Sequence, residues 1–234
     1  GDQNALEKII NIGTCPEDVP VVLELAQKFN PNVFCTLGIH PHDAKEYNDK
    51  VERYILDHLG DREVVAVAEI GLDYYYDHSP REIQRKVFRR QLQIAVEHNM
   101  PVQIHTRDAE QDTVDILSEF SGKLKGVIHC FTGTQWLADE ALKMGLNISI
   151  SGVVTFKNAH SLREIVKTVP LERINLETDA PFLAPGPQRG KKNEPAFVVH
   201  TAEFVANLKQ IPIDVLAQQT KKNALEVFPK IDWT

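Results

Sequence analysis

Short apolar runs alternate with amphipathic helical patterns along the chain. The runs are nearly continuous in Val, Ile and Leu, which is typical of strands buried on both faces, as in parallel sheets. We predict seven strands: Lys8–Gly13, Val33–Ile39, Val64–Ile70, Pro101–His105, Gly126–Cys130, Leu146–Ser151 and Arg173–Thr178.

The segments between these runs have helical periodicity, with apolar residues on one face and charged residues elsewhere. We predict helices over Glu82–Asn99, Thr113–Phe120, Trp136–Met144, Ser161–Val169, Ala196–Leu208 and Ile213–Phe228. Ser161 followed by Glu164 has the spacing of a capping box at a helix start. Successive βα units indicate a parallel sheet with crossover helices. No linker or change in composition interrupts the pattern, so we predict one domain over residues 1–234.

Ionisable residues collect at the ends of the predicted strands. Five such residues are His40, Glu69, His105, His129 and Asp179. In parallel α/β folds the ligand site lies beyond the carboxyl ends of the strands. A single histidine there is usually structural, but a buried carboxylate is costly unless it is paired or bound to a cation. We therefore predict a common centre that holds a cation.

The composition narrows the class of protein. The chain has 234 residues, 42% of them hydrophobic, and a net charge of −7. No apolar stretch approaches the roughly 18 residues of a membrane span, and the charge does not indicate a broad nucleic-acid-binding surface. The cysteines are Cys15, Cys35 and Cys130. Their number and spacing predict reduced thiols in a cytoplasmic protein (or a nuclear one in a eukaryote) and argue against a cysteine zinc site.

Six segments carry a family resemblance: Gly38–His42, Ala68–Tyr74, Pro101–Arg107, His129–Gly133, Ser149–Gly152 and Leu176–Pro185. Through them the chain resembles the TatD family of metal-dependent deoxyribonucleases, within the amidohydrolase-like (β/α)8 barrels. The resemblance covers essentially the whole chain and implies an α/β fold, a (β/α)8 TIM barrel.

The front of the chain departs from the family pattern. Members of this family open with a strand that carries His-x-His, and here no histidine precedes His40. The seven predicted strands also fall one short of a closed barrel. We therefore expect that the first strand and helix are missing from this sequence, either by truncation or because the printed sequence omits them.

The resemblance also implies a catalytic centre. Glu69, His105, His129 and Asp179 are implied to bind one or two divalent cations, and mixed carboxylate and imidazole ligands suit Mg, Mn or Zn. We expect Glu69 and Asp179 to be catalytic, with Glu69 bridging the cations and Asp179 acting as general base or water orienter. Glu177 is two residues before Asp179 and is interpreted as a supporting residue.

The residues expected to bind substrate are His40, His42, Arg107 and Arg189. We interpret the two histidines as lining the site, in contact with substrate phosphate or a ligand carboxylate, rather than as the missing cation ligands. The arginines can each hold two phosphate oxygens. Other arginines, within Arg81–Arg90, are interpreted as a solvated helix face. The tyrosines Tyr74–Tyr76 include packing residues and leave room for one that stacks on a base.

These features together predict a metal-dependent nuclease with an exonuclease-like action on single-stranded DNA or DNA ends, because a local basic rim suits a strand end better than wrapped duplex. Two alternatives stay open at this point. One is a D-aminoacyl-tRNA deacylase or another ester hydrolase on the same barrel. The other is an inactive, truncated remnant that binds nucleic acid. No membrane partner is expected, and the sequence leaves open whether the protein is a monomer or an oligomer.

Overall fold

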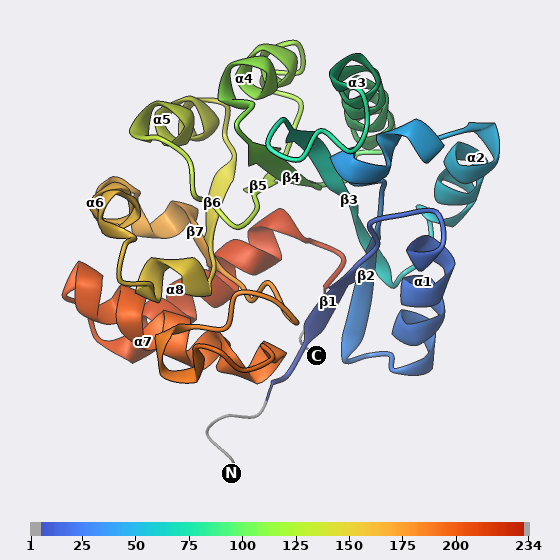
Figure 1. Cartoon of the computed structure of the whole chain (residues 1–234). Helices are drawn as coiled ribbons and strands as arrows, with labels where there is room; N and C mark the ends of the chain where they lie inside the picture. The colour runs from blue at the N-terminus through green and yellow to red at the C-terminus, as the bar shows by residue number, and fades with distance from the viewer. Residues whose placement is uncertain (1–5, 232–234) are drawn as a thin grey trace. The chain divides into compact units, whose positions relative to one another are not determined.

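The computed structural model describes residues 6–231, and within that range it contains seven β-strands, each at a predicted run (Figure 1). The strands are β1 (Ile9–Ile12), β2 (Val33–Leu37), β3 (Val64–Asp73), β4 (Val102–Arg107), β5 (Gly126–Ile128), β6 (Asn147–Ile150) and β7 (Ile174–Leu176). β3 runs beyond the predicted end at Ile70, as far as Asp73. All ten of its positions are buried, which explains why its sequence does not alternate apolar with polar.

The chain divides into two compact units. The first unit contains residues 8–127 and 227–231, and the second contains residues 6–7 and 128–226. In the first unit, β1 to β4 pair in parallel in chain order. In the second unit, β6 pairs with β7 in parallel, with Ile148 opposite Ile174. The α/β class with parallel pairing is thus confirmed. A single domain stays a prediction, and the expected absence of a first strand and helix is not confirmed.

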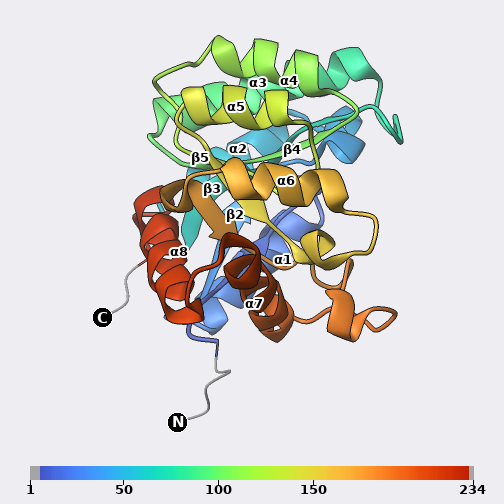
Figure 2. The same ribbon diagram turned by 90° about the vertical axis from the view of Figure 1, so that its left-hand side faces the viewer.

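Helices follow most of the strands. They are α1 (Asp18–Lys28), α2 (Asp49–His58), α3 (Arg81–Glu97), α4 (Glu110–Ser118), α5 (Gln135–Lys143), α6 (His160–Thr168), α7 (Val198–Lys209) and α8 (Ile213–Val227), with short 3₁₀ helices η1 (Pro41–Glu46), η2 (Gly152–Thr155), η3 (Leu171–Arg173), η4 (Gly186–Gln188) and η5 (Pro195–Phe197). In the first unit, α1, α2 and α3 lie on one side of the strands (Figure 1). In the second unit, the segment that contains η4 and η5 winds beside α7 (Figure 2).

The predicted capping box at Ser161 is wrong. Helix α6 begins at His160 and its N-cap is Ala159, which makes no side-chain cap hydrogen bond. Because the helix starts one residue earlier than predicted, Ser161 already occupies a helical position and cannot act as the N-cap. Helices α1 and α2 were not among the predicted helices. The buried face of α1 nevertheless has helical spacing, with Val19, Val22, Leu23 and Ala26.

Gly71 lets β3 and β4 approach each other closely. Its φ is +145°, and a Cβ at this position would lie 1.9 Å from the carbonyl oxygen of His105. Only glycine therefore fits at this point of the strand pair. The close approach occurs between Glu69 and Asp73 on β3 and brings both residues beside His105 on β4.

Within the first unit, Lys230 anchors the C-terminal segment of the described chain to the connection between α2 and β3. Its Nζ donates hydrogen bonds to the carbonyl oxygens of Leu59, Asp61 and Val64 over 2.7, 3.1 and 2.9 Å. Burial lowers the pKa of this ammonium group. The three hydrogen bonds replace water around the charge and satisfy carbonyl groups from the end of α2 to the start of β3.

Two further expectations concern membranes and cysteines. Among residues 6–231, no helix combines the length and the apolar character that crossing a membrane requires. All three cysteines are free thiols, as predicted.

Candidate active site

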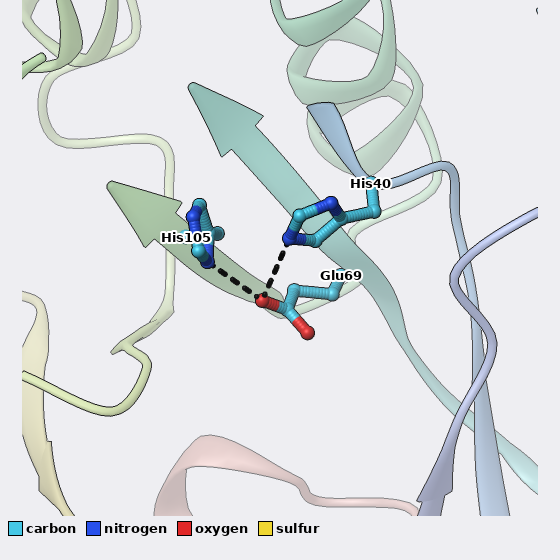
Figure 3. Close-up of side chains that lie close together, drawn as sticks. All are labelled: His40, Glu69 and His105. Atoms are coloured by element: carbon cyan, nitrogen blue, oxygen red, sulfur yellow. Dashed lines mark hydrogen bonds and ion pairs between the residues drawn. The ribbon is translucent and has the colours of Figure 1, made fainter. Parts of the chain in front are cut away.

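His40, Glu69 and His105 form a cluster in the first unit. Figure 3 shows Glu69 on β3 between His105 on β4 and His40 after β2. Glu69 Oε1 lies 3.1 Å from His105 Nδ1 and 3.5 Å from His40 Nε2. One ligand atom from each side chain lies within 4.8 Å of the other two, a spacing that can hold a metal ion. Glu69 is only 8% exposed, so its charge depends on these neighbours.

Asp73 supports His105 from the opposite side of the ring. Its Oδ2 lies 3.0 Å from His105 Nε2 and 3.1 Å from His42 Nε2. When Asp73 accepts the Nε2–H of His105, the lone pair of Nδ1 is left facing Glu69. Cation-binding histidines are commonly oriented by such a carboxylate on their second nitrogen. The histidine, Glu69 and Asp73 therefore match the requirements of a cation site.

Asp73 is ionised at neutral pH although it is 1% exposed. Burial raises its pKa, but hydrogen bonds from His105 and the backbone N–H of Tyr76, together with the nearby His42 ring, outweigh burial and hold the pKa well below its usual range. This residue was not predicted to belong to the site. The sequence contained one signal that could have placed Asp73 in the site. Asp73 and Glu69 are separated by an even number of positions along one strand, so both side chains lie on the same face.

The hydrogen bonds of His40 favour a donor role for this ring. The backbone N–H of His42 donates to His40 Nδ1 over 3.1 Å. We therefore assign the proton of the neutral ring to Nε2, the nitrogen that faces Glu69. Burial lowers the pKa of His40 to about 3, so the ring is neutral at pH 7. His40 thus presents an Nε2–H, which suits hydrogen bonding to an oxygen better than binding of a cation.

A second cluster lies in the second unit and contains His129, Glu177 and Asp179. His129 Nδ1 lies 2.8 Å from Glu177 Oε1, and His129 Nε2 lies 3.3 Å from Asp179 Oδ1. Glu177 also accepts hydrogen bonds from the backbone N–H of Cys130 over 2.9 Å and from Ser149 Oγ over 2.5 Å. With these donors engaged, Glu177 is placed to orient His129, and the second imidazole nitrogen faces Asp179.

The two clusters follow the same plan. In each, one nitrogen of a histidine (His105 or His129) contacts a carboxylate that other donors hold in place. The other nitrogen faces a second carboxylate, Glu69 or Asp179. Neutral imidazole with carboxylate is a donor set for Mg, Mn or Zn. The residues of each cluster therefore fit a divalent cation, and the ligand roles of Glu69, His105, His129 and Asp179 stay a prediction.

The expected substrate-binding arginines lie on aromatic rings. Arg107 Cζ lies 4.0 Å from the ring centroid of Tyr75, and Arg189 Cζ lies 3.8 Å from that of Phe156. The arginines of α3 are different, because each has a carboxylate partner. These ion pairs are Arg81 with Asp77, Arg85 with Asp112, Arg89 with Glu119 and Arg90 with Glu52. Their charges are compensated locally, in agreement with the interpretation of a solvated helix face.

Comparison with known proteins identifies the family. The family model described as "TatD related DNase" matches residues 2–229. This chain belongs to the TatD family. Among its relatives, the uncharacterized metal-dependent hydrolase YabD of Bacillus subtilis is 40% identical over 224 residues, which are 95% of this chain and 88% of YabD. A Pectobacterium carotovorum protein named 3'-5' ssDNA/RNA exonuclease TatD is 36% identical over 233 residues, 97% of this chain and 89% of that protein.

Solved structures of TatD proteins have the same fold. The crystal structure of YjjV, a TatD homologue from Escherichia coli K12, superposes with a TM-score of 0.90 at 29% identity, over 97% of this chain and 88% of YjjV. A TatD family hydrolase from Entamoeba histolytica superposes with a TM-score of 0.86 at 25% identity, over 97% of this chain and 86% of that chain. The predicted resemblance to TatD proteins is confirmed, and with it membership of a family of metal-dependent hydrolases.

Proposed function

We propose that this TatD chain is a deoxyribonuclease that hydrolyses phosphodiester bonds with one or two divalent cations, acting on single-stranded DNA or frayed ends. The observation that carries this proposal is the repeated arrangement of a supported histidine facing a carboxylate, with His105 and Glu69 in one unit and His129 and Asp179 in the other. The relative named 3'-5' ssDNA/RNA exonuclease TatD supports the choice of substrate.

Glu69, His105, His129 and Asp179 are the residues that would hold the cations. A divalent cation bound by them supplies Lewis-acid polarisation of the scissile phosphate and lowers the pKa of a bound water. Asp179 is 31% exposed in its side chain, against 10% for Glu69, so water reaches it more easily. In the proposed reaction Asp179 accepts a proton from the attacking water, and Glu69 holds charge within its own buried cluster.

Neutral and cationic donors would position the phosphate. The Nε2–H of His40 points at a carboxylate oxygen and can instead donate to a phosphate oxygen. His42 lies next to it, with the two ring centroids 4.4 Å apart. Arg107 and Arg189 provide planar guanidinium groups that can each bond two phosphate oxygens.

The test compares substrates and metals with one preparation of the protein. Metal-stripped protein is supplied in turn with Mg²⁺, Mn²⁺ or Zn²⁺, and product release is measured from linear single-stranded DNA, closed circular single-stranded DNA and a D-aminoacyl-tRNA. We expect metal-dependent release of nucleotides from the linear strand only. Equal cleavage of the closed circle would exclude the exonuclease-like action. Faster turnover of the aminoacyl ester would favour the deacylase alternative.

A further inference from the structure

Tyr75, Tyr76 and Arg107 form an exposed cluster in the first unit, here called the tyrosine–arginine platform. Tyr75 is 58% and Tyr76 49% exposed. Arg107 Cζ lies 4.0 Å from the centroid of the Tyr75 ring and 4.9 Å from that of Tyr76, and the two rings meet edge to face with centroids 4.8 Å apart. Neighbouring exposed aromatic and arginine side chains are typical of surfaces that bind a ligand.

Arg107 differs from the arginines of α3 in the groups that surround its guanidinium. Within residues 6–231, the Arg107 side chain contacts two aromatic faces and has no carboxylate at ion-pair distance. A guanidinium over an aromatic ring needs none of its N–H groups for that contact, so they stay available to an acceptor. Arg107 can therefore contact the rings and bind a phosphate oxygen at the same time.

The platform is held in place before any ligand binds. Asp73 Oδ1 accepts hydrogen bonds from the backbone N–H groups of Tyr75 over 3.1 Å and Tyr76 over 2.9 Å. The backbone N–H of Tyr74 donates to the carbonyl oxygen of Arg107 over 2.9 Å, which ties the turn to the end of β4. A binding surface that is already ordered loses less conformational entropy when it binds.

The platform also adjoins the candidate cation ligands. Arg107 and His105 are two residues apart on β4, so their side chains emerge on the same face, about 7 Å apart along the strand. The Tyr76 ring contacts the edge of His42 with centroids 5.4 Å apart. The carboxylate of Asp73 thus positions the tyrosine turn with one oxygen and His105 with the other.

We propose that the tyrosine–arginine platform stacks on an unpaired base of the DNA strand whose phosphodiester is hydrolysed. This inference rests on the proposed nuclease function and adds a subsite to it. Aromatic stacking tolerates any base, because every base has a π-face. A base inside a duplex is already stacked and paired, so the platform selects single strands and frayed ends. Arg107 binds the phosphate beside the stacked base.

The test compares a variant that lacks the Tyr75 ring with a matched control variant that keeps the ring. Tyr75→Leu removes the exposed ring, and Tyr75→Phe keeps the ring without the hydroxyl. Binding is measured in Mg²⁺ with a fluorescent phosphorothioate oligothymidylate, which resists hydrolysis, and with an abasic strand of the same length and linkage. We expect Tyr75→Leu to weaken binding of the oligothymidylate about tenfold and to leave binding of the abasic strand unchanged. Tyr75→Phe should bind both strands as the wild type does.

The outcomes separate the platform from the nuclease proposal. If Tyr75→Leu binds the oligothymidylate as tightly as the wild type, or loses the same factor on the abasic strand, the platform proposal is overturned and the nuclease proposal stands. If the wild type binds neither strand, both proposals fail. Competition with duplex DNA tests the proposal independently by measuring the preference for single strands. This preference should be larger for the wild type than for Tyr75→Leu. Circular dichroism verifies that both variants are folded.

Discussion

Asp73→Asn tests whether the Asp73 carboxylate supports the candidate metal site by orienting His105, or only fills space in the protein interior. Asparagine has almost the same shape as aspartate, and its carbonyl oxygen can still accept the backbone N–H groups of Tyr75 and Tyr76. Its amide nitrogen, however, would face His105 Nε2, where Asp73 Oδ2 now lies at 3.0 Å. Two donors would then meet. The ring would carry its proton on Nδ1 instead, and the lone pair that faces Glu69 would be lost.

The size of the effect follows from this change of tautomer. Removing a carboxylate that orients a metal-binding histidine weakens metal affinity by roughly 10- to 100-fold, which corresponds to about 1.4 to 2.8 kcal/mol. We expect a loss in this range for Mn²⁺ binding by Asp73→Asn. The assay is calorimetric titration of metal-stripped wild type and variant at pH 7. Asp77→Asn is the matched control, because Asp77 is an exposed carboxylate whose ion-pair partner is Arg81.

A folded Asp73→Asn protein that binds Mn²⁺ within about twofold of the wild type would contradict the orienting role of Asp73. His105 would then keep its lone pair toward Glu69 without help from Asp73. A loss of equal size in Asp77→Asn would show that charge removal alone, rather than orientation of His105, lowers the affinity.

Three more predictions concern the other cluster, the C-terminal anchor and the ion pair of α3. Glu177→Gln should weaken metal binding by roughly 10-fold in the same titration, because it removes the carboxylate that contacts His129 Nδ1. Lys230→Met should lower the free energy of unfolding by about 1–3 kcal/mol in urea, since three carbonyl groups lose their donor; an unchanged midpoint would contradict the anchoring role. The hydrogen bond from Arg90 holds the pKa of Glu52 below its usual range. The resulting stability, on the order of 1 kcal/mol, is present above the ordinary pKa of a glutamate and is lost as the pH falls through the lower folded-state pKa. The loss of unfolding free energy that Glu52→Gln causes at pH 7 in urea should therefore shrink as the buffer is made acidic, and a loss that does not depend on pH would contradict this.

The strands could be predicted because their sequences carry the signal of burial on both faces. β3 shows both the strength and the limit of that signal. Its apolar run from Val64 predicted the strand, but the prediction ended at Ile70 and missed the continuation to Asp73. In the structure Gly71, just beyond that predicted end, allows the close approach to His105. Helix starts were harder to place, as Ser161 illustrates, because the position of an N-cap depends on the path of the backbone.

The candidate site could be predicted as a set of residue types but not as a set of hydrogen bonds. Strand ends pointed to Glu69 and His105, and the structure places them in contact. The supporting role of Asp73 and the donor role of His40 depend on which nitrogen meets which neighbour. Sequence spacing contains no such information. The resemblance to the TatD family supplied ligand identities that spacing alone left open.

The most direct test of the central claim is the metal dependence of DNA hydrolysis by the wild type and His105→Ala. Nucleotide release from linear single-stranded DNA is measured with metal-stripped protein, then after addition of Mg²⁺, Mn²⁺ or Zn²⁺. We predict no release in excess chelator, restored release with at least one of these cations, and a large loss in His105→Ala. Hydrolysis that persists in excess chelator, or that none of the three cations restores, would contradict a metal-dependent nuclease.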